Sequence, residues 1–370
     1  MSTFEVKVCK ITSVKNHPNA DKLDVCRVQN FEWDVITGRD QYKVNDLVVY
    51  VPMDAVLPES IIKTLNQKIS LGNGHIRAAK IRGLVSYGMF LPVDKNMKLG
   101  DDVAEKLGIK KYEQPATGRY LTRNGNIVSK KKLNPLFDKY TDIEHLKRHP
   151  NSFIREDGSP DEVVVSEKIH GSNIRMSYLP RPGSKWYHKI RNLFIGDYEY
   201  CVGSRQVQQK LDGTTGKTWL ETQGKTSVNV YVEIFNRLNC RKWLPKDTIV
   251  YGEVYGKGIQ DLEYGLNDIA FICFDVKVKG RYLNYDELKA FCIEHNLSMV
   301  HEFYRGPWKQ DCLEYRNGLN IAGITNTHIR EGVVVRPVKE RHDDSLGRVI
   351  LKVISEDYLT RSNDDATEFQ

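Results

Sequence analysis

Hydrophobic and polar positions alternate over the first hundred residues with the period of half-buried strands. Residues 4–11 read F-E-V-K-V-C-K-I and residues 23–28 read L-D-V-C-R-V. A third short run covers residues 33–37, and an apolar run at 46–52 ends in proline. Short strands at this spacing, separated by turn residues, predict a small β-barrel over residues 1–100.

The last part of this predicted barrel places basic residues between apolar ones. It reads H-I-R-A-A-K-I-R-G at residues 75–83, and a short apolar run follows. Arg77, Lys80 and Arg82 therefore fit two interpretations. They are either the solvated face of a strand or a basic stripe against the phosphate backbone of a nucleic acid.

The chain from residue 135 to 370 contains more strand-like than helix-like runs. The strand-like runs lie at 162–165, 248–254, 269–278, 332–338 and 349–354. The helix-like runs lie at 227–238, 285–295 and, shorter, at 142–148. This mixture predicts an α+β domain of largely antiparallel sheets flanked by helices. Residues 101–134, which are polar and basic between 121 and 132, predict a connector.

Composition narrows the class of protein. Charged residues make up 28% of the chain and the formal net charge is +7, which favours a polyanionic partner. No run of about 18 apolar residues would cross a membrane, and the N-terminus lacks the pattern of a signal peptide. The seven cysteines are scattered without a C-x-x-C pair. We therefore expect buried thiols in a reducing compartment, the cytoplasm, and neither a disulfide framework nor a zinc site.

A lysine follows the apolar run V-V-V at residues 163–165, and this placement needs an explanation. Lys168 precedes Ile-His-Gly, and Gly171 permits a tight bend of the backbone. A lysine that faces a cavity at a strand end serves as a nucleophile once its amine is neutral. The spacing K-x-x-G alone is common by chance and does not identify a site.

Four further strand-like runs each carry a charged residue at or beside a buried position. They contribute Glu253, Asp275, Glu331 and Lys352. Because an unpaired buried charge is costly, we expect these side chains to converge on one polar cavity with Lys168. Carboxylates that hold a divalent metal, and lysines that meet phosphate charge, suit a nucleoside triphosphate.

The motifs occur in an order that resembles a known family. They are E-K-I-H-G-S-N at 167–173, G-S-R at 203–205, Y-G-E-V at 251–254, F-D-V at 274–276, E-G-V-V-V-R at 331–336 and L-K-V-I-S at 351–355. This set resembles the covalent nucleotidyltransferases, and among them ATP-dependent RNA ligases of the double-strand-sealing type. The run I-R-A-A-K-I-R-G-L-V-S-Y-G-M-F-L-P at 76–92 resembles part of the N-terminal OB domain of a two-domain subgroup. The resemblance implies an OB-type β-barrel over residues 1–100 and a nucleotidyltransferase domain over 135–370.

The resemblance also implies a chemistry of RNA repair. Lys168 is similar to the lysine that attacks the α-phosphate of ATP to form a lysyl-AMP, and Lys352 to the lysine that neutralises this phosphate. AMP then passes to an RNA 5′-phosphate, and a 3′-hydroxyl displaces it. The expected cofactors are ATP and Mg²⁺ or Mn²⁺. The expected partner is RNA with 5′-phosphate and 3′-hydroxyl ends, as in a nicked duplex, without an obligate protein partner.

Further residues take expected roles from the same motifs. Glu253 and Glu331 are similar to metal-associated carboxylates, and Phe274 to an aromatic residue that stacks on adenine. His170 is expected to act beyond the adenylylation of the lysine. The residues expected to contact RNA are Arg77, Lys80, Arg82 and Arg205. The residues expected to bind ATP or AMP are Glu167, His170, Gly171, Asn173, Arg205, Glu253, Phe274, Val333, Arg336 and Lys352.

The chain departs from the family pattern in its last motif. The family often has K-x-K there, but position 350 is isoleucine, and Arg348 on the same strand face is a candidate substitute. Upstream, Lys147 or Arg148 is a weaker candidate for contact with the pyrophosphate leaving group.

Two rival interpretations stay open. A DNA ligase or an RNA guanylyltransferase usually has aspartate where His170 stands, and the 18 residues after Lys352 leave no room for the C-terminal OB domain of those enzymes. A non-catalytic binder is suggested by H-P-N-A-D-K-L at 17–23, which resembles the start of tRNA-binding OB modules. Such a binder would not need the charged motif residues in this order.

Overall fold

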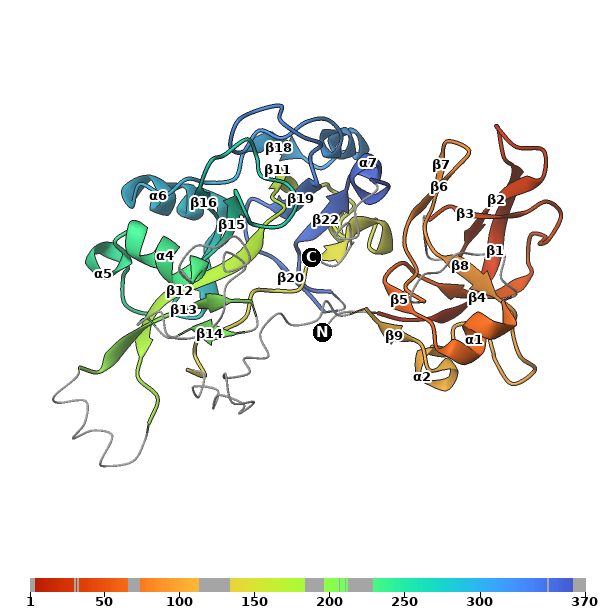
Figure 1. The fold of residues 1–370 in the computed structure, drawn as a ribbon, viewed down its shortest axis with the longest axis horizontal. Helices are drawn as coiled ribbons and strands as arrows, with labels where there is room; N and C mark the ends of the chain where they lie inside the picture. Colours follow the sequence, from red (N-terminus) through yellow and green to blue (C-terminus); the bar gives the residue numbers. More distant parts are fainter. Residues whose placement is uncertain are drawn as a thin grey trace. The chain divides into compact units, whose positions relative to one another are not determined.

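The computed structural model describes residues 4–29, 31, 33–65, 74–112, 134–183, 196–205, 207–209, 211, 229–344 and 346–361. Most of the predicted connector, including its basic stretch, lies outside these residues. The chain divides into two compact units (Figure 1). The first comprises Met1–Pro115, Glu144–Ser152 and Val353–Gln370, and the second Ala116–Ile143 and Phe153–Lys352.

The first unit is built on an antiparallel sheet with the strand order β3-β2-β1-β4-β8. Its strands are β1 (Lys7–Asn16), β2 (Leu23–Val28), β3 (Val35–Gly38), β4 (Leu47–Val51) and β8 (Met89–Leu91). The segments at its two edges are tied together. The Tyr87 N–H donates to the Asp34 carbonyl at 2.8 Å, and the Ile36 N–H donates to Ser86 Oγ at 3.0 Å. The sheet is therefore a nearly closed barrel, as the alternating pattern predicts.

Short elements complete this unit. They are β5 (Ala55–Val56), α1 (Glu59–Thr64), β6 (Ala79–Ile81), β7 (Leu84–Ser86), α2 (Ala104–Leu107) and β9 (Lys110–Lys111). Val8 and Val49 pack in one buried cluster with Val103 and Ile109. The packing of the barrel thus extends past residue 100, and the domain limits expected from the sequence stay a prediction.

The segment at residues 142–148 is not the short helix that the sequence predicts. It contains the strand β10 (Glu144–His145), followed by the 3₁₀ turn η1 (Leu146–Arg148). The His145 side chain accepts the Lys147 N–H at 3.1 Å, so it caps this turn. The buried ring of His145 packs on Trp33, with 4.7 Å between ring centroids. Tertiary packing of the segment thus outweighs its weak helical pattern.

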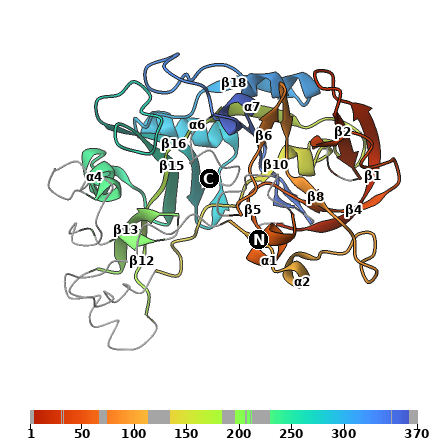
Figure 2. The same ribbon diagram turned by 45° about the vertical axis from the view of Figure 1, so that its right-hand side comes forward.

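The second unit contains an antiparallel sheet with the order β14-β13-β12-β15-β16-β17. Its strands are β12 (Ser172–Pro180), β13 (Tyr198–Ser204), β14 (Gln208–Gln209), β15 (Thr248–Gly256), β16 (Ile269–Val278) and β17 (Arg281–Tyr282). β12 and β15 are its two central strands, and β15 and β16 run side by side (Figure 2). The sequence predicts β15 and β16 but misses β12 and β13.

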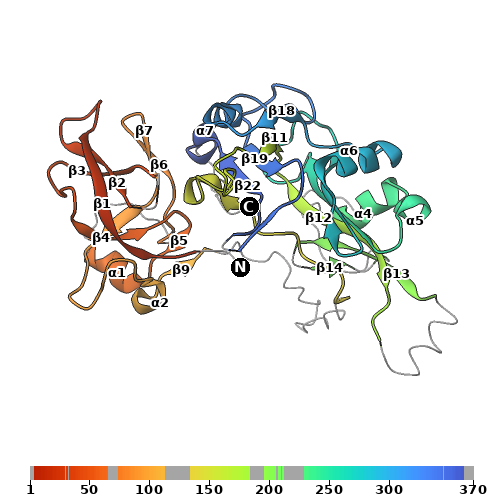
Figure 3. The same cartoon turned by 180° about the vertical axis from the view of Figure 1, so that it is seen from behind.

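A second group of strands includes the neighbours β22-β19-β11-β18, in which β11 pairs antiparallel with both β18 and β19. Its strands are β11 (Glu162–Lys168), β18 (Glu302–Pro307), β19 (Gly332–Pro337) and β22 (Leu351–Ile354), whose last two residues belong to the first unit. β19 and β22 lie next to each other (Figure 3). β18 is a further strand that the sequence pattern does not reveal.

Helices cover one face of the β12-β15-β16 sheet. They are α4 (Val230–Arg237), α5 (Cys240–Trp243) and α6 (Tyr285–Glu294), while η3 (Gln310–Arg316) and α7 (Glu356–Leu359) lie elsewhere in the chain. Ile174, Met176 and Val254 on the sheet pack in one cluster with Phe235 of α4 and Leu288 of α6. Because side chains alternate along a strand, the other face carries Asn173, Arg175, Tyr251, Glu253 and Asp275. The polar residues of the motifs therefore lie on the face that these helices leave open.

All seven cysteines are buried. In the described ranges, no helix combines the length and the apolar character needed to cross a bilayer.

Candidate active site

Lys168 and Glu331 meet where β11 ends and β19 begins. The antiparallel register of β11 and β19 pairs Lys168 with Gly332. Lys168 Nζ donates a hydrogen bond to Glu331 Oε1 at 2.7 Å, and only 13% and 1% of the two side chains are exposed. The other carboxylate oxygen, Glu331 Oε2, is buried and has no hydrogen-bond partner among the described residues. A buried acceptor of this kind marks a place for a cation or a donor.

Gly171 brings the chain that follows Lys168 close to β15. A Cβ atom at this position would lie 2.4 Å from the Val254 carbonyl oxygen and 2.8 Å from Glu253 Cγ. Any larger residue would therefore push β15 or the Glu253 side chain away. The glycine thus explains how the first motif and Glu253 come to share one site.

Asn173 and Glu253 lie opposite each other on β12 and β15. Asn173 Oδ1 is buried without a hydrogen-bond partner among the residues described, as is Glu331 Oε2. Two buried acceptors without partners among the described residues thus lie in one site with two carboxylates and one lysine, which suits a cationic or hydrogen-bond-donating ligand.

The electrostatic environment of Glu253 is unusual. Burial raises the pKa of its carboxyl to about 8, and the nearby negative charge of Glu331 adds to this rise. Lys168 and Arg205 lower the pKa but do not cancel the effect of burial. Glu253 thus holds a proton at neutral pH unless positive charge enters the site, and a divalent cation would supply that charge.

Arg205 lies beside this cluster at the end of β13. It forms an ion pair with Asp142. The sequence predicts Asp142 only as the start of a short helix and gives it no role in the site. Burial lowers the pKa of the Arg205 guanidinium, and the charge of Glu253 opposes this. The structure therefore brings Arg205 to the same site as Glu253.

Phe274 is the extra residue of a β-bulge in β16. Tyr251 pairs with Asp275 whereas Gly252 pairs with Cys273, so Phe274 has no partner on β15. Its half-buried ring packs on the cluster of Tyr140 and Tyr251, 4.8 Å from the Tyr140 ring. The bulge explains how both Phe274 and the buried Asp275 come to the face of the sheet opposite α4 and α6.

The geometry of β19 favours Val334 over Val333 as the residue that faces the site. Val334 pairs with Ser166 and shares the face of Lys168, whereas Val333 pairs with Glu167 on the opposite face. Val333 is fully buried. Val334 is half-buried and packs on the same cluster as Phe274. The sequence reasoning misses Val334, because only the register decides between adjacent valines.

Glu167 has structural partners on a loop of the same unit. Its two carboxylate oxygens accept the N–H groups of Ile321 and Ala322, each at 2.9 Å. Burial raises the pKa of Glu167, although these two hydrogen bonds lower it. The structure therefore does not bring its carboxylate to Lys168, and a contact between Glu167 and ATP stays a prediction.

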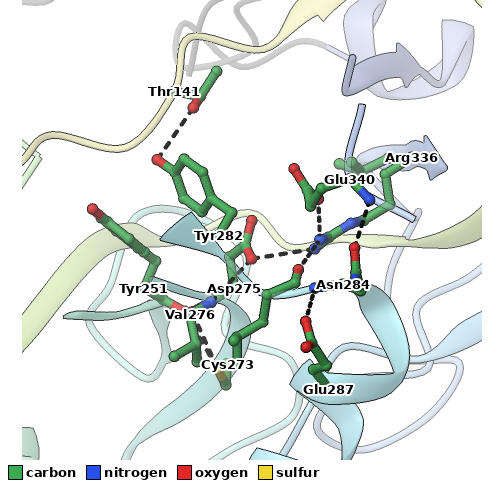
Figure 4. Close-up of polar contacts among 12 residues, drawn as sticks. Thr141, Tyr251, Cys273, Asp275, Val276, Tyr282, Asn284, Glu287, Arg336 and Glu340 are labelled. Carbon is green, nitrogen blue, oxygen red and sulfur yellow. Dashed lines mark hydrogen bonds and ion pairs between the residues drawn. The ribbon is translucent and has the colours of Figure 1, made fainter. Parts of the chain in front are cut away.

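Arg336 lies four positions along β19 from Gly332, the partner of Lys168, which corresponds to about 13 Å. Its guanidinium is ion-paired with Asp275 at 3.3 Å and also with Glu340 (Figure 4). Arg348 binds the same two carboxylates, at 2.6 Å each. Neither arginine joins the Lys168 cluster, so the structure gives no support to an ATP contact of Arg336 or to Arg348 as the missing motif lysine.

Lys352 lies on β22, the neighbour of β19, and only 3% of the residue is exposed. The convergence of Lys352 with Lys168 on one polar site, and its role at phosphate, stay predictions.

His170 is held in place by two residues that carry no recognisable motif. Its Nε2 lies 2.6 Å from Asp261 Oδ1, and its backbone N–H donates to the Tyr264 hydroxyl at 2.7 Å. The imidazole is completely buried. Asp261 is 91 positions from His170 in the sequence, so the sequence pattern holds no signal for this pair.

The basic residues of the barrel are exposed. Arg77, Lys80 and Arg82 lie on or next to the β6–β7 hairpin, and Arg82 forms its turn with a φ of 49°. Lys80 Nζ lies 3.6 Å from a carboxylate oxygen of Asp357, with both side chains at least half exposed. The surface is thus accessible to solvent, and its contact with RNA stays a prediction.

The two upstream basic candidates have partners within the first unit. Lys147 Nζ lies over the rings of Trp33 and Tyr87, at 4.9 and 4.2 Å from their centroids. Arg148 is ion-paired with Glu144 at 3.6 Å. Contact of either with pyrophosphate stays a prediction.

Family models match both parts of the chain. An RNA ligase model matches residues 161–354, which is more than half of the chain and includes Lys168, Glu253, Glu331 and Lys352. The chain belongs to the RNA ligase family. A model of an OB-fold domain matches residues 5–93, so the barrel of this RNA ligase is an OB fold.

Solved RNA ligases have a similar fold. An RNA ligase variant of Naegleria gruberi matches 97% of this chain and 98% of its own, with a TM-score of 0.70 and 20% identity. A lysine-to-alanine variant of that ligase with ATP and Mn matches 96% of this chain and 98% of its own, with a TM-score of 0.69 and 20% identity. At this low identity, the likeness shows the shared fold.

Curated relatives match only part of the chain. The phenylalanine–tRNA ligase β subunit of Syntrophotalea carbinolica is 33% identical over 99 residues, which is 26% of this chain and 11% of the relative. The cytoplasmic tyrosine–tRNA ligase of Xenopus laevis is 36% identical over 90 residues, which is 24% of this chain and 14% of the relative. The chain thus spans about a tenth to a seventh of these proteins.

Proposed function

We propose that this RNA ligase joins RNA 3′-hydroxyl and 5′-phosphate ends at the expense of ATP, through a lysyl-AMP on Lys168. The observation that carries the proposal is the cluster of Lys168, Glu331 and Glu253, with a buried unpartnered oxygen on Glu331. A cluster of two carboxylates and a lysine suits a metal-bound triphosphate. Support for ATP comes from the similar Naegleria ligase, which was solved with ATP and Mn.

In the first step of the proposal, the neutral amine of Lys168 attacks the α-phosphorus of ATP. A nitrogen–phosphorus bond forms, the bond to the leaving pyrophosphate breaks, and the lysine proton is lost. The hydrogen bond between Lys168 and Glu331 must open before the attack. Lys352 stabilises the phosphate charge that develops, and Phe274 and Val334 hold the adenine.

In the later steps AMP moves from Lys168 to the 5′-phosphate of an RNA, and a 3′-hydroxyl oxygen then attacks that phosphate and releases AMP. Each step exchanges one ligand at phosphorus, so no further reactant is needed. The proposal assigns Asn173, Arg205 and His170 to contacts with the nucleotide and the RNA end. Asn173 has a buried acceptor without a partner among the described residues, and Arg205 lies near Glu253.

The residues present fit a divalent cation. Glu331 Oε2 is a buried acceptor without a partner, and the Glu253 carboxylate is ionised more easily when a positive charge is near. Within the described ranges, no group of three His, Cys, Asp or Glu side chains is arranged as a metal site, so phosphate oxygens and water would complete the coordination. Mg²⁺ or Mn²⁺ would neutralise charge on the phosphates.

We also propose the finer features of the substrate. Nicks in duplex RNA are the preferred ends, as the resemblance to double-strand-sealing ligases implies. The OB fold, with Arg77, Lys80 and Arg82, grips the RNA backbone, and the partial likeness to tRNA ligases supports RNA as the bound nucleic acid. Buried cysteines fit a reducing compartment, the cytoplasm. We expect no obligate protein partner.

Transfer of label from α-labelled ATP to the denatured protein, with Mn²⁺ present, tests this function. We expect label on the wild type and none on Lys168→Ala. Lys277→Ala is the matched control, because Lys277 is also a half-buried lysine in a short ion pair, 2.5 Å from Asp138. Label on Lys168→Ala, or none on the wild type after removal of any bound AMP, would overturn the proposal. Sealing of a nicked duplex is then compared with joining of single strands.

A further inference from the structure

A buried network of charges lies next to the residues that would hold the base. Asp275 is completely buried and is ion-paired with Arg336 at 3.3 Å and with Arg348 at 2.6 Å. The Tyr140 hydroxyl donates to Asp275 Oδ2 at 2.8 Å. One carboxylate thus binds three donors from three different segments of the chain.

Glu340 closes this network from the other side. Both Arg336 and Arg348 are ion-paired with it, and Figure 4 shows the Arg336 guanidinium between the carboxylates of Asp275 and Glu340. The Glu340 N–H donates to the Asn284 side chain at 2.8 Å, at the start of α6. Two positive and two negative side chains therefore balance in the interior.

The charges in this network are strongly coupled. Burial alone would raise the pKa of Asp275, but Arg336, Arg348 and the Tyr140 hydroxyl outweigh it and hold the pKa below its ordinary value. Arg348 also stacks on the Tyr282 ring, with 3.7 Å between the guanidinium carbon and the ring centroid. All four charged groups are thus fixed in one arrangement.

Stability alone does not explain such a network. Well-packed apolar side chains of similar volume often stabilise an interior as well as a buried ion pair does. Directional contacts, however, fix the register and separation of the segments that carry them. The location of the network indicates which two segments it holds at a fixed separation.

The network joins the strands that carry Phe274 and Val334. Asp275 directly follows Phe274 in the β16 bulge, and Arg336 lies two residues after Val334 on β19. Phe274 and Val334 are both half-buried and pack on the same cluster around Tyr251. The ion pair between Asp275 and Arg336 therefore directly links the strand that carries Phe274 to the strand that carries Val334.

We propose that Asp275, Arg336 and Arg348 are positioning residues that set the gap between Phe274 and Val334, and thereby the selectivity of the site for the base of the nucleotide. The inference rests on the proposed function. It adds that these three buried residues determine which nucleotide base the site accepts. It also gives Arg336 a role through its neighbours instead of through phosphate contact.

Asp161 offers a matched control. It too is buried and binds two arginines, Arg155 at 2.8 Å and Arg341 at 2.7 Å, but it lies immediately before β11, at the end opposite Lys168. Asp275→Asn and Asp161→Asn each remove one charge from a buried carboxylate that binds two arginines, and the arginines of Asp161 are the more exposed pair. Arg348→Lys is a milder variant that keeps the charge and loses the planar guanidinium.

The experiment measures lysyl-AMP formation with ATP and with GTP, together with the urea midpoint of each variant. For Asp275→Asn and Arg348→Lys we expect the KM for ATP to rise about tenfold and the preference for ATP over GTP to fall by a similar factor. For Asp161→Asn we expect a lower urea midpoint with the wild-type KM and preference. If Asp275→Asn does not fold, Arg348→Lys decides.

Three results would overturn the inference. An unchanged preference for ATP in Arg348→Lys and in any folded Asp275→Asn would remove the role in base selection. An equal change in Asp161→Asn would show a general loss of structure. A wild type that takes up no label would remove the proposed function itself, and the inference with it, so the two failures are distinguishable.

Discussion

Lys168 Nζ lies 2.7 Å from Glu331 Oε1, although 163 positions separate the two residues in the sequence. The contact is a short ion pair between largely buried side chains at the ends of β11 and β19. Removal of either partner leaves the other charge in a place with little water, which is costly. The two charges are therefore energetically coupled before any substrate binds.

A double-mutant cycle of Lys168→Met and Glu331→Gln measures this coupling. We expect each single change to lower the free energy of unfolding. The loss in the double variant should be smaller than the sum of the two single losses by about 1–3 kcal/mol. The same cycle on Lys277 and Asp138, whose aspartate is 45% exposed, should give a coupling below about 1 kcal/mol. Equal coupling in both cycles, measured by urea unfolding, would contradict this account.

Gly171 is expected to tolerate no side chain. In Gly171→Ala the new Cβ would meet the Val254 carbonyl oxygen and the Glu253 side chain, both closer than 3 Å. We expect lysyl-AMP formation to fall at least about tenfold, because even small displacements of Glu253 disturb the geometry of the site.

Gly158→Ala is the control for a change at glycine. Gly158 has a φ of 79° but no atom within 4 Å of the added Cβ, so this variant should lose about 1 kcal/mol of stability and keep its rate. A normal rate for Gly171→Ala at a normal urea midpoint would show that β15 yields more easily than the backbone contacts suggest.

The amino-acid pattern predicts the strands that carry the site and much of its convergence. The runs at 248–254 and 269–278 become β15 and β16, and the carboxylates Glu253 and Glu331 lie near Lys168 as the cost of buried charge requires. β12 is not among the predicted strands, although residues 173–178, N-I-R-M-S-Y, alternate polar and apolar side chains as a half-buried strand does.

Other parts of the site depend on contacts between distant segments. A pattern of charges cannot tell that Arg336 pairs with Asp275, and a run of valines cannot tell that Val334 and not Val333 shares the face of Lys168. Both follow from register, which tertiary packing sets. The partner of His170, Asp261, lies in a loop whose sequence has no distinguishing spacing.

Glu253 should give the stability of the metal-free protein a distinct pH dependence. Its pKa is about 8 in the folded protein against a reference value of 4.5, so the folded state binds the proton more tightly than the unfolded chain does. Stability is then highest below the unfolded pKa and falls as the pH rises toward the folded pKa. Allowing for its partial exposure, we expect a loss on the order of 3 kcal/mol between about pH 5 and pH 9.

Glu253→Gln should lack this loss. Urea unfolding in EDTA across the pH range compares it with the wild type and with Glu294→Gln, a change at an exposed glutamate of α6. The difference in unfolding free energy between Glu253→Gln and the wild type should grow with pH. The difference between Glu294→Gln and the wild type should not change with pH. Parallel curves for all three proteins would contradict the elevated pKa of Glu253.

Asp261 should influence the joining of RNA more than the adenylylation of the protein. Its carboxylate lies 2.6 Å from His170 Nε2 and fixes the orientation of a buried imidazole. For His170→Ala we expect label on Lys168 but little sealed RNA. For Asp261→Asn we expect the same direction, with sealing about tenfold slower.

Pre-adenylylated nicked RNA separates these two steps, because its sealing does not require the lysyl-AMP. Glu263→Gln, a change at an exposed acidic residue of the same loop, is the control and should seal at the wild-type rate. If Asp261→Asn slowed lysyl-AMP formation as much as sealing, the pair of His170 and Asp261 would belong to the first step instead.

The basic residues of the β6–β7 hairpin should contribute to RNA affinity and not to lysyl-AMP formation. Arg77, Lys80 and Arg82 are exposed, and the ion pair of Lys80 with Asp357 is too solvated to compete strongly with phosphate. We expect Arg77→Gln, Lys80→Gln and Arg82→Gln together to weaken RNA binding and to reduce the slope of log affinity against log salt by about 2.

A second triple variant decides whether this effect is local. Lys95, Lys98 and Lys106 are exposed lysines of the same unit outside the hairpin, and their replacement by glutamine removes the same total charge. Non-specific attraction would lower the salt slope equally in both variants, since it depends on net charge alone. A larger drop in the salt slope of the hairpin variant, with lysyl-AMP formation unchanged, would locate an RNA contact on the OB fold. Equal drops in both variants would show that these three residues are only a solvated strand face.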